Sequence, residues 1–285
     1  MQITLRRGKP ADAAECGQIL FDAFNTISKH HNFPPDVPST EMAVNFLNMA
    51  LARPDIYAVV AEADGKIIGS NFFWEGDAIA GIGPITIDPK DQNAGVGRRL
   101  MEDVLARAEE KNFPGVRLVQ AAFHNRSMAL YTKLGFEVRE PLACIQGTPL
   151  KQSLPGFTVR AMTSADLPAC NELCRKVHGH DRKSELPGGM EQKTAVVAER
   201  DGSIAGYSTG IGFFTHSVAE SNAALKALIA AAPEFSGPGF LLPIRNSEMF
   251  RWCLNQGLRV TQPLTLMTLG LYNEPHGAYL PSILY

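Results

Sequence analysis

The chain has 285 residues, a net charge of −2, and 45% hydrophobic and 20% charged residues. These values are typical of globular proteins and exclude a disordered chain, and the near-neutral charge argues against a nucleic-acid partner, which a basic face would mark. No apolar run is long enough to span a membrane, and the first residues lack the pattern of a secretory signal. We therefore expect a cytoplasmic protein of two ordinary-sized domains, with no membrane association.

In the first half of the chain, apolar and β-branched runs predict strands, and apolar positions recurring every three or four residues predict helices. In chain order we expect a strand at 3–6, helices at 11–28 and 40–52, strands at 56–62, 66–74 and 80–87, a helix from Val96, a strand at 116–123, a helix from Asn125 and a strand at 137–145. Gly83 and Pro84 suit an irregular strand at 80–87.

The second half reads as a shortened version of the first. We expect strands near Phe157, Thr194, Ile204 and Phe240, a helix at 222–232, and a tail at 261–285 rich in Leu, Pro and Tyr. The five cysteines are odd in number and form no Cys-x-x-Cys pair. They are expected to be buried thiols in a reducing compartment, without a metal site.

A glycine-containing turn joins the strand at 80–87 to the helix from Val96. Its pattern is Gln-x-x-Gly-x-Gly, from Gln92 through Gly95 to Gly97. Glycines let a ligand approach the first helical turn, whose free N–H groups and positive dipole end favour an anion. The turn lacks the Gly-Lys-Ser/Thr ending of a nucleotide triphosphate loop, and Leu100 replaces the third glycine of a dinucleotide fingerprint. The pattern therefore predicts a different phosphate-binding loop.

About thirty residues later, a short helix is predicted from Asn125, its expected N-cap, to Gly135, its expected C′ residue. The two segments resemble the two signature motifs of the GCN5-related N-acetyltransferase (GNAT) superfamily. Its second motif, Asn-x-x-Ala-x-x-x-Tyr-x-x-x-Gly-Phe, is matched at Asn125, Ala129, Tyr131, Gly135 and Phe136, although Ala129 stands closer to Tyr131 than in many members.

The resemblance implies a mixed α/β (α+β) fold that binds acetyl-CoA as co-substrate and needs no metal. It implies that backbone groups of Ile85 and Ile87 contact the pantetheine arm and the thioester carbonyl, and that Asn125 bonds the coenzyme arm. Tyr131 would be the general acid for the departing thiolate, the alternative being a core tyrosine. The residues expected around the pyrophosphate are Gln92, Asn93, Ala94, Gly95, Val96, Gly97 and Arg98.

The chain also repeats itself. Residues 3–16 match 157–170, residues 60–69 match 197–206, and Asn125 corresponds loosely to Asn246, in the same order. We therefore expect two tandem GNAT-like domains, each a mixed, mostly antiparallel sheet flanked by helices. The first spans 1–147 and binds acetyl-CoA, a linker follows at 148–156, and the second spans 157–285. The second copy lacks the phosphate loop, so it should bind no coenzyme.

The function expected from the resemblance is acetyl transfer to a primary amine, either a small molecule or a peptide N-terminus, by a monomer or homodimer. The alternative is a non-catalytic coenzyme A or acyl-CoA sensor. The general base stays open, and an ordered water chain could replace it; the candidates are Glu75, Asp77, His124, His30 and His31. His216 and Glu220, at helical spacing, lack a third metal ligand nearby and could instead line a pocket between the halves.

Overall fold

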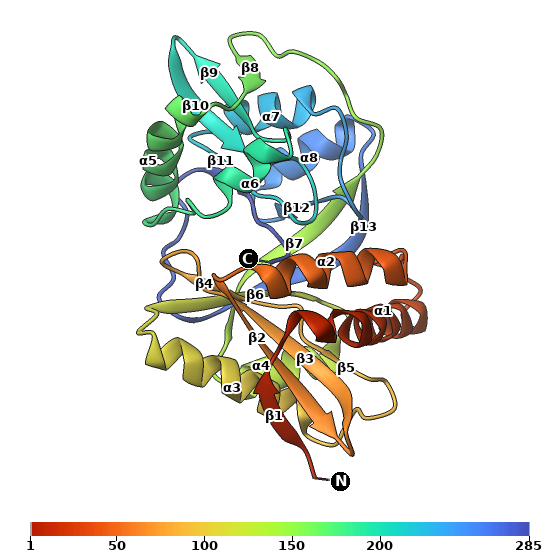
Figure 1. The fold of residues 1–285 in the computed structure, drawn as a ribbon. Helices are drawn as coiled ribbons and strands as arrows, with labels where there is room; N and C mark the ends of the chain where they lie inside the picture. Colours follow the sequence, from red (N-terminus) through yellow and green to blue (C-terminus); the bar gives the residue numbers. More distant parts are fainter. Residues whose placement is uncertain (1, 285) are drawn as a thin grey trace.

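The computed structural model describes residues 2–284, so Met1 and Tyr285, the outer ends of the two expected domains, lie outside the described residues. The chain forms two lobes (Figure 1). The N-terminus lies at the far end of the first lobe, and the C-terminal end of the chain lies between the lobes. Within residues 2–284, every helix is too short or too polar to cross a membrane.

Residues 4–146 follow the order of elements expected from the sequence. They form β1 (Thr4–Arg7), α1 (Ala13–His30), α2 (Thr40–Ala52), β2 (Ile56–Ala63), β3 (Lys66–Trp74), β4 (Ala80–Ile82), β5 (Thr86–Ile87), α3 (Val96–Glu110), β6 (Gly115–Ala121), α4 (Asn125–Lys133) and β7 (Glu137–Gln146).

The remaining elements belong to the second half of the chain. They are β8 (Thr158–Ala161), α5 (Leu167–His178), α6 (Leu186–Glu191), β9 (Val196–Arg200), β10 (Ser203–Ser208), β11 (Ser217–Ala219), α7 (Asn222–Ala231), β12 (Phe240–Pro243), α8 (Ser247–Asn255), β13 (Arg259–Gly270) and β14 (Ala278–Leu280). Of these, β13 and β14 lie in the tail to which the sequence assigned no element.

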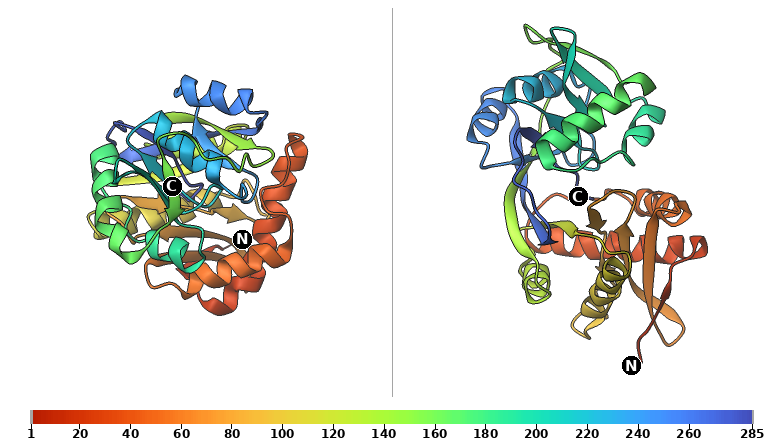
Figure 2. Two further views of the ribbon diagram at one scale, coloured as in Figure 1. Left: turned by 90° about the horizontal axis from the view of Figure 1, so that it is seen from above. Right: turned by 90° about the vertical axis from the view of Figure 1, so that its left-hand side faces the viewer.

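The strands form two mixed, mostly antiparallel sheets flanked by helices, as predicted. The larger sheet has the order β1-β2-β3-β4-β6-β13-β7-β12, and the smaller has the order β14-β11-β10-β9-β8. The strand pairs of both sheets are antiparallel, except that β4 runs parallel to β6. Helices α1 and α2 pack on one face of the larger sheet, and α3 packs on the other (Figure 2).

The larger sheet takes strands from both halves of the chain. Strand β13 lies between β6 and β7, and its Leu264 pairs with Ala121 on one side and Leu142 on the other. Strand β12 then pairs with the outer side of β7. The long strands β7 and β13 run side by side from one lobe to the other (Figure 2). The lobes are therefore joined by a shared sheet as well as by the segment at 147–157.

The strand expected at 80–87 is irregular, as its Gly83-Pro84 sequence suggested. It is divided into β4, which pairs with β6, and β5, which pairs with β3. Since β5 has no pairing with β6, a gap opens between these two strands. Helix α3 follows the gap, and its predicted apolar line is buried at Val96, Leu100, Val104 and Ala108.

The internal repeat is visible as a repeated set of ion pairs. In the first half, Arg6 binds Asp12 at 2.8 Å and Glu62 at 2.6 Å. In the second half the two distances are the same, between Arg160 and its partners Asp166 and Glu199. These are matching positions of the sequence repeats, so the two halves share local structure as well as sequence. The five cysteines are buried, as expected, and each is a free thiol.

Candidate active site

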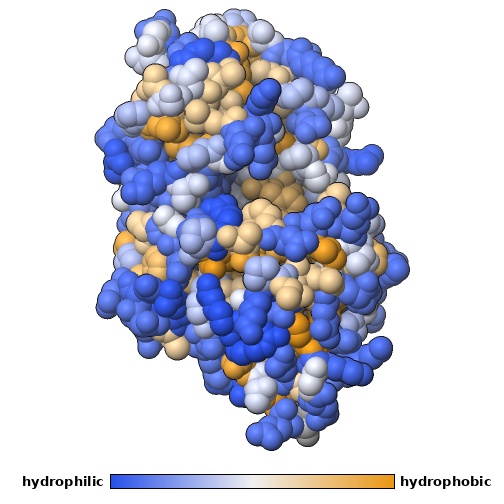
Figure 3. Space-filling model, in the orientation of Figure 1, coloured by the Kyte–Doolittle hydropathy of each residue, from blue (hydrophilic) through white to orange (hydrophobic). Residues whose placement is uncertain are grey.

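A cavity of about 1050 Å³ follows the gap between β5 and β6 and continues beneath the second lobe. Figure 3 shows the hollow between the lobes, with hydrophobic residues inside it. Its walls come from α1, α2, the segment at 83–98, β6 and α4 of the first half, and from the segments at 184–192, 209–215 and 283–284 of the second half. A volume of this size is at the upper end for small-molecule sites.

The predicted phosphate loop forms one end of this cavity. Asn93 and Gly95 adopt left-handed backbone conformations, with φ of 71° and 79°, and α3 begins directly after Gly95. The first turn of a helix leaves its N–H groups without intrahelical partners, so those of Val96 and Gly97 are available to an anion. A Cβ placed on Gly95 would meet no protein atom within 4 Å. The loop therefore has the open backbone that a pyrophosphate requires.

Arg126, which sequence reasoning missed, connects the loop to α4. Its guanidinium donates to the Gln92 side-chain oxygen at 2.9 Å and to the Asn93 side-chain oxygen at 3.2 Å. Arg126 also lines the cavity, so it adds positive charge at the loop. Arg126 lies in the first turn of α4, where the predicted helix puts it. Its contact with the loop depends on how α4 packs beside the loop, which no local pattern in the sequence reveals.

Tyr131 on α4 lies deep in the same site. It lines the cavity but is only 5% exposed, and its ring packs 6.2 Å from that of Phe136, measured between centroids. Burial raises the pKa of Tyr131 to about 12, opposed by a hydrogen bond from the Ser127 side chain. The hydroxyl therefore stays protonated at neutral pH. Tyr131 is thus part of the core and also borders the cavity.

His124, and not Asn125 as predicted, caps α4. The His124 Nδ1 atom accepts from the Ser127 backbone N–H at 3.1 Å and contacts the Ser127 hydroxyl at 2.7 Å. Burial lowers the pKa of His124, in keeping with a neutral acceptor. Asn125 instead is the first residue of the helix and is exposed. Because the helix begins at Asn125, one residue earlier than predicted, His124 occupies the N-cap position and Asn125 does not.

Most of the predicted site residues converge on the cavity. Those that line it are Ile85, Ile87, Gln92, Asn93, Gly95, Val96, Gly97, Arg98 and Tyr131. Ala94 and Asn125 do not line it. The Arg98 side chain is held by Glu102 at 2.7 Å on the outer side of α3, which leaves its backbone as the part nearest the loop.

Some of the candidate general bases line the cavity and others do not. Asp77 and His124 line the cavity, whereas Glu75 is held by Arg107 in a two-bond pair at 2.9 Å. Asp77 accepts hydrogen bonds from the backbone N–H of Ser184 at 3.0 Å and from its hydroxyl at 2.6 Å. Burial raises the pKa of Asp77, which these bonds oppose.

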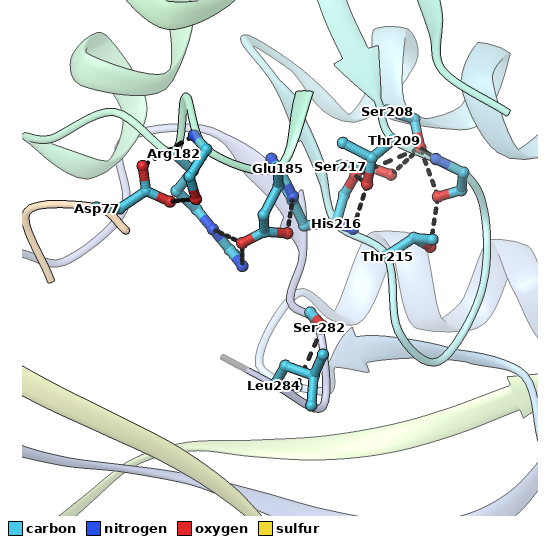
Figure 4. Close-up of polar contacts among 12 residues, drawn as sticks. Asp77, Arg182, Glu185, Ser208, Thr209, Thr215, His216, Ser217, Ser282 and Leu284 are labelled. Atoms are coloured by element: carbon cyan, nitrogen blue, oxygen red, sulfur yellow. Dashed lines mark hydrogen bonds and ion pairs between the residues drawn. The ribbon is translucent and has the colours of Figure 1, made fainter. Parts of the chain in front are cut away.

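A buried polar network in the second half supports the wall near Asp77 (Figure 4). Glu185, which lines the cavity, accepts from Arg182 Nε at 3.0 Å and from His216 Nδ1 at 2.8 Å. His216 also contacts the hydroxyl of Tyr207 through Nε2 at 3.1 Å. Burial lowers the pKa of His216, so a neutral ring bridges the two residues.

The sequence interpretation of His216 and Glu220 as a pair at helical spacing is wrong. His216 precedes strand β11, so no helix places the two side chains together. His216 is buried, whereas Glu220 is exposed. Within residues 2–284, no group of three or more His, Cys, Asp or Glu side chains is arranged to hold a metal ion.

Residues 22–136 match the sequence model of the acetyltransferase (GNAT) family. The D-amino-acid N-acetyltransferase HPA3 of Saccharomyces cerevisiae is 24% identical over 132 residues, which are 42% of this chain and 81% of that protein. A putative acetyltransferase from Pyrococcus horikoshii aligns with a TM-score of 0.75 and 17% identity, over 99% of this chain and 92% of its own. A tandem GNAT protein from the clavulanic acid biosynthesis pathway aligns with a TM-score of 0.57 and 14% identity, over 94% and 98%.

The fold and the family match together define an acyltransferase. Residues 22–136 match the acetyltransferase (GNAT) family, and the chain as a whole has the fold of a tandem GNAT protein. Acetyl-CoA is the acyl donor that this family uses.

Proposed function

We propose that the chain transfers the acetyl group of acetyl-CoA to a primary amine within the cavity between its two lobes. The pyrophosphate binds the loop at 92–98, with Arg126 beside it. The pantetheine arm follows the gap between β5 and β6, where backbone groups of Ile85 and Ile87 are unpaired with β6. The observation that carries this proposal is that the phosphate loop and the Tyr131 helix open onto one cavity.

The reaction we infer is direct attack. The amine nitrogen bonds to the carbonyl carbon of the thioester, the carbon–sulfur bond breaks, and the amide and a thiolate form. The thiolate takes the proton of the Tyr131 hydroxyl, and the amine proton passes to a cavity carboxylate or water. A thiolate is a good leaving group, so a phenol whose pKa is raised to about 12 donates only as negative charge develops on the sulfur.

We further infer that residues 1–147 hold the coenzyme, that 148–156 link the halves, and that 157–285 hold none. At the place of the phosphate loop the second half has the segment at 210–221, whose Phe213, Phe214 and Thr215 line the cavity. The second half therefore supplies walls to the acceptor side of the site.

The test combines calorimetry with turnover. Titration with coenzyme A should give one site per chain, and acetyl-CoA should be consumed faster, beyond hydrolysis, in the presence of at least one member of an amine panel. Two equivalent sites would contradict the assignment of the halves. Coenzyme binding without turnover of any amine would favour a sensor over an enzyme.

A further inference from the structure

The acceptor side of the cavity is walled by aromatic and other apolar side chains from both halves. The Phe46 ring on α2 lies 5.5 Å from that of Phe214 in the second half and 6.3 Å from that of Trp74, between centroids. Further apolar residues that line this side are Leu20, Phe24, Ile27, Val37, Phe213 and Ile283. A polar acceptor would gain little from such walls.

Three apolar side chains of the cavity wall are unusually exposed to solvent. Met42, Met49 and Phe214 are 51%, 42% and 41% exposed, and all three line the cavity. Exposed apolar surface that gathers at a concave site marks a binding surface, whereas single exposed residues do not. Phe214 and Phe46 belong to different halves, so this surface exists only when the lobes are assembled.

One carboxylate of the cavity wall has no basic partner among the described residues. Asp36, in the segment between α1 and α2, accepts a hydrogen bond from Nε2 of Gln262 on β13 at 2.6 Å. Among residues 2–284, no basic side chain forms an ion pair with Asp36, and burial raises the pKa of this carboxyl. A desolvated carboxylate is stabilised by a positive charge placed beside it.

Two other acidic side chains of the cavity wall already have basic partners. Asp55 pairs with Arg53 at 2.5 Å, and Glu185 binds Arg182 and His216. Asp36 therefore differs from them in that its partner is a neutral amide. Asp77 also forms no ion pair among the described residues, but it accepts two hydrogen bonds from Ser184, whereas Asp36 accepts one from Gln262. Asp36 therefore has the least compensated charge of these four carboxylates.

We propose that the acceptor is an amine with an apolar body, in which the body occupies the surface formed by Phe46, Phe214 and Met42, and Asp36 attracts the ammonium group. This inference rests on the proposed function and narrows its amine to an apolar-bodied class. A small hydrophilic amine would satisfy Asp36 but leave the apolar surface wet. A neutral apolar molecule would cover that surface but leave Asp36 without a countercharge.

The test measures binding separately from turnover, with Trp74 as the reporter. The chain has two tryptophans, and Trp252 is partly buried against the second-half core, so Trp252→Phe leaves Trp74 as the fluorophore at the cavity. With coenzyme A saturating, three probes are titrated: 2-phenylethylamine, ethanolamine and 2-phenylethanol. The proposal predicts that 2-phenylethylamine binds at least tenfold more tightly than either of the others.

Two variants divide the contributions. Phe214→Ala should weaken 2-phenylethylamine at least tenfold and leave ethanolamine unchanged. Asp36→Asn, which keeps the acceptor oxygen for Gln262, should weaken 2-phenylethylamine at least fivefold and leave 2-phenylethanol unchanged. Leu254→Ala is the matched control, since Leu254 is 43% exposed but does not line the cavity, and it should bind all three probes like the parent.

Ethanolamine binding as tight as that of 2-phenylethylamine would overturn the inference, and so would unchanged 2-phenylethylamine affinity in both variants. Selective binding of 2-phenylethylamine without its acetylation would uphold the ligand class and contradict the proposed function. Efficient acetylation of ethanolamine, at the same kcat/KM as 2-phenylethylamine, would uphold the function and contradict the class.

Discussion

Ser184 of the second half donates both its backbone N–H and its hydroxyl to the carboxylate of Asp77 in the first half, at 3.0 and 2.6 Å. The two residues are 107 positions apart, and both line the cavity. The wall on this side is therefore made at the contact between the lobes, and neither half contains it alone.

The first prediction concerns the isolated first half. Residues 1–147 lack β13, so β6 and β7 would each lose a partner strand and expose a hydrogen-bonding edge. We expect this fragment to aggregate or unfold, as measured by size-exclusion chromatography and circular dichroism. Co-expression with residues 148–285 should restore a soluble complex. A monomeric, folded 1–147 fragment would contradict the structural role of β13.

The second prediction concerns the phosphate loop. Gly95 has φ of 79° and Gly65 has φ of 77°, and a Cβ at either would meet no protein atom within 4 Å. Gly95→Ala and Gly65→Ala should therefore destabilise the fold equally, by about 1 kcal/mol each. Because the added methyl at position 95 enters the cavity, coenzyme A affinity measured by calorimetry should fall at least tenfold in Gly95→Ala alone. Equal affinities in the two variants would place the pyrophosphate elsewhere.

The loop and its helix could be predicted because their signals are local. The spacing of Gln92, Gly95 and Gly97 and the apolar line of α3 lie within twenty residues and follow from turn and helix geometry. The contact of Gln262 with Asp36 spans 226 residues and depends on β13 entering the first sheet. No periodicity reveals such an insertion, so the acceptor side of the site could not be predicted from the sequence.

The capping of α4 shows a limit at short range as well. Asn125 is the better N-cap by residue type, yet His124 makes the capping bond because its Nδ1 reaches the Ser127 N–H. Residue preference is outweighed here by where the chain turns into the helix. The corresponding residue of the second half, Asn246, caps α8 through its side chain and the N–H of Met249.

The third prediction concerns Glu185 and pH. Burial opposes its ionisation, but Arg182 and His216 outweigh burial and lower the pKa of Glu185 from 4.5 to about 2. A lowered folded-state pKa means that this stabilisation is complete above the ordinary pKa and is lost as the pH falls toward 2. Glu185→Gln should therefore lower the free energy of unfolding at pH 7 by about 3 kcal/mol, because it removes the carboxylate charge that binds the buried side chains of Arg182 and His216.

Urea unfolding at pH 7 and at pH 3 measures this effect. The difference between Glu185→Gln and the parent should shrink at the lower pH. Glu248→Gln, which removes the ion pair between the exposed Glu248 side chain and Lys226, should leave the free energy of unfolding nearly unchanged. A Glu185→Gln loss that is equal at both pH values would contradict the lowered pKa.

The fourth prediction concerns the pH dependence of the reaction. Since burial raises the pKa of Tyr131 to about 12, its hydroxyl remains a proton donor throughout the usual assay range. We expect kcat with a saturating amine to show no decline on the basic side up to about pH 10, near the pKa of an unperturbed tyrosine. A basic limb with a midpoint between pH 8 and 9, in the range of an activated phenol, would contradict the protonated state assigned to Tyr131.

The most direct test of acetyl transfer with Tyr131 as the general acid is to measure kcat for Tyr131→Phe with the best acceptor. The substitution keeps the ring against Phe136, so coenzyme A affinity and the melting temperature should barely change. If the Tyr131 hydroxyl protonates the thiolate, kcat should fall by about 10- to 1000-fold while KM for acetyl-CoA changes little. A Tyr131→Phe protein with kcat within twofold of the parent would contradict the role of Tyr131 as the acid.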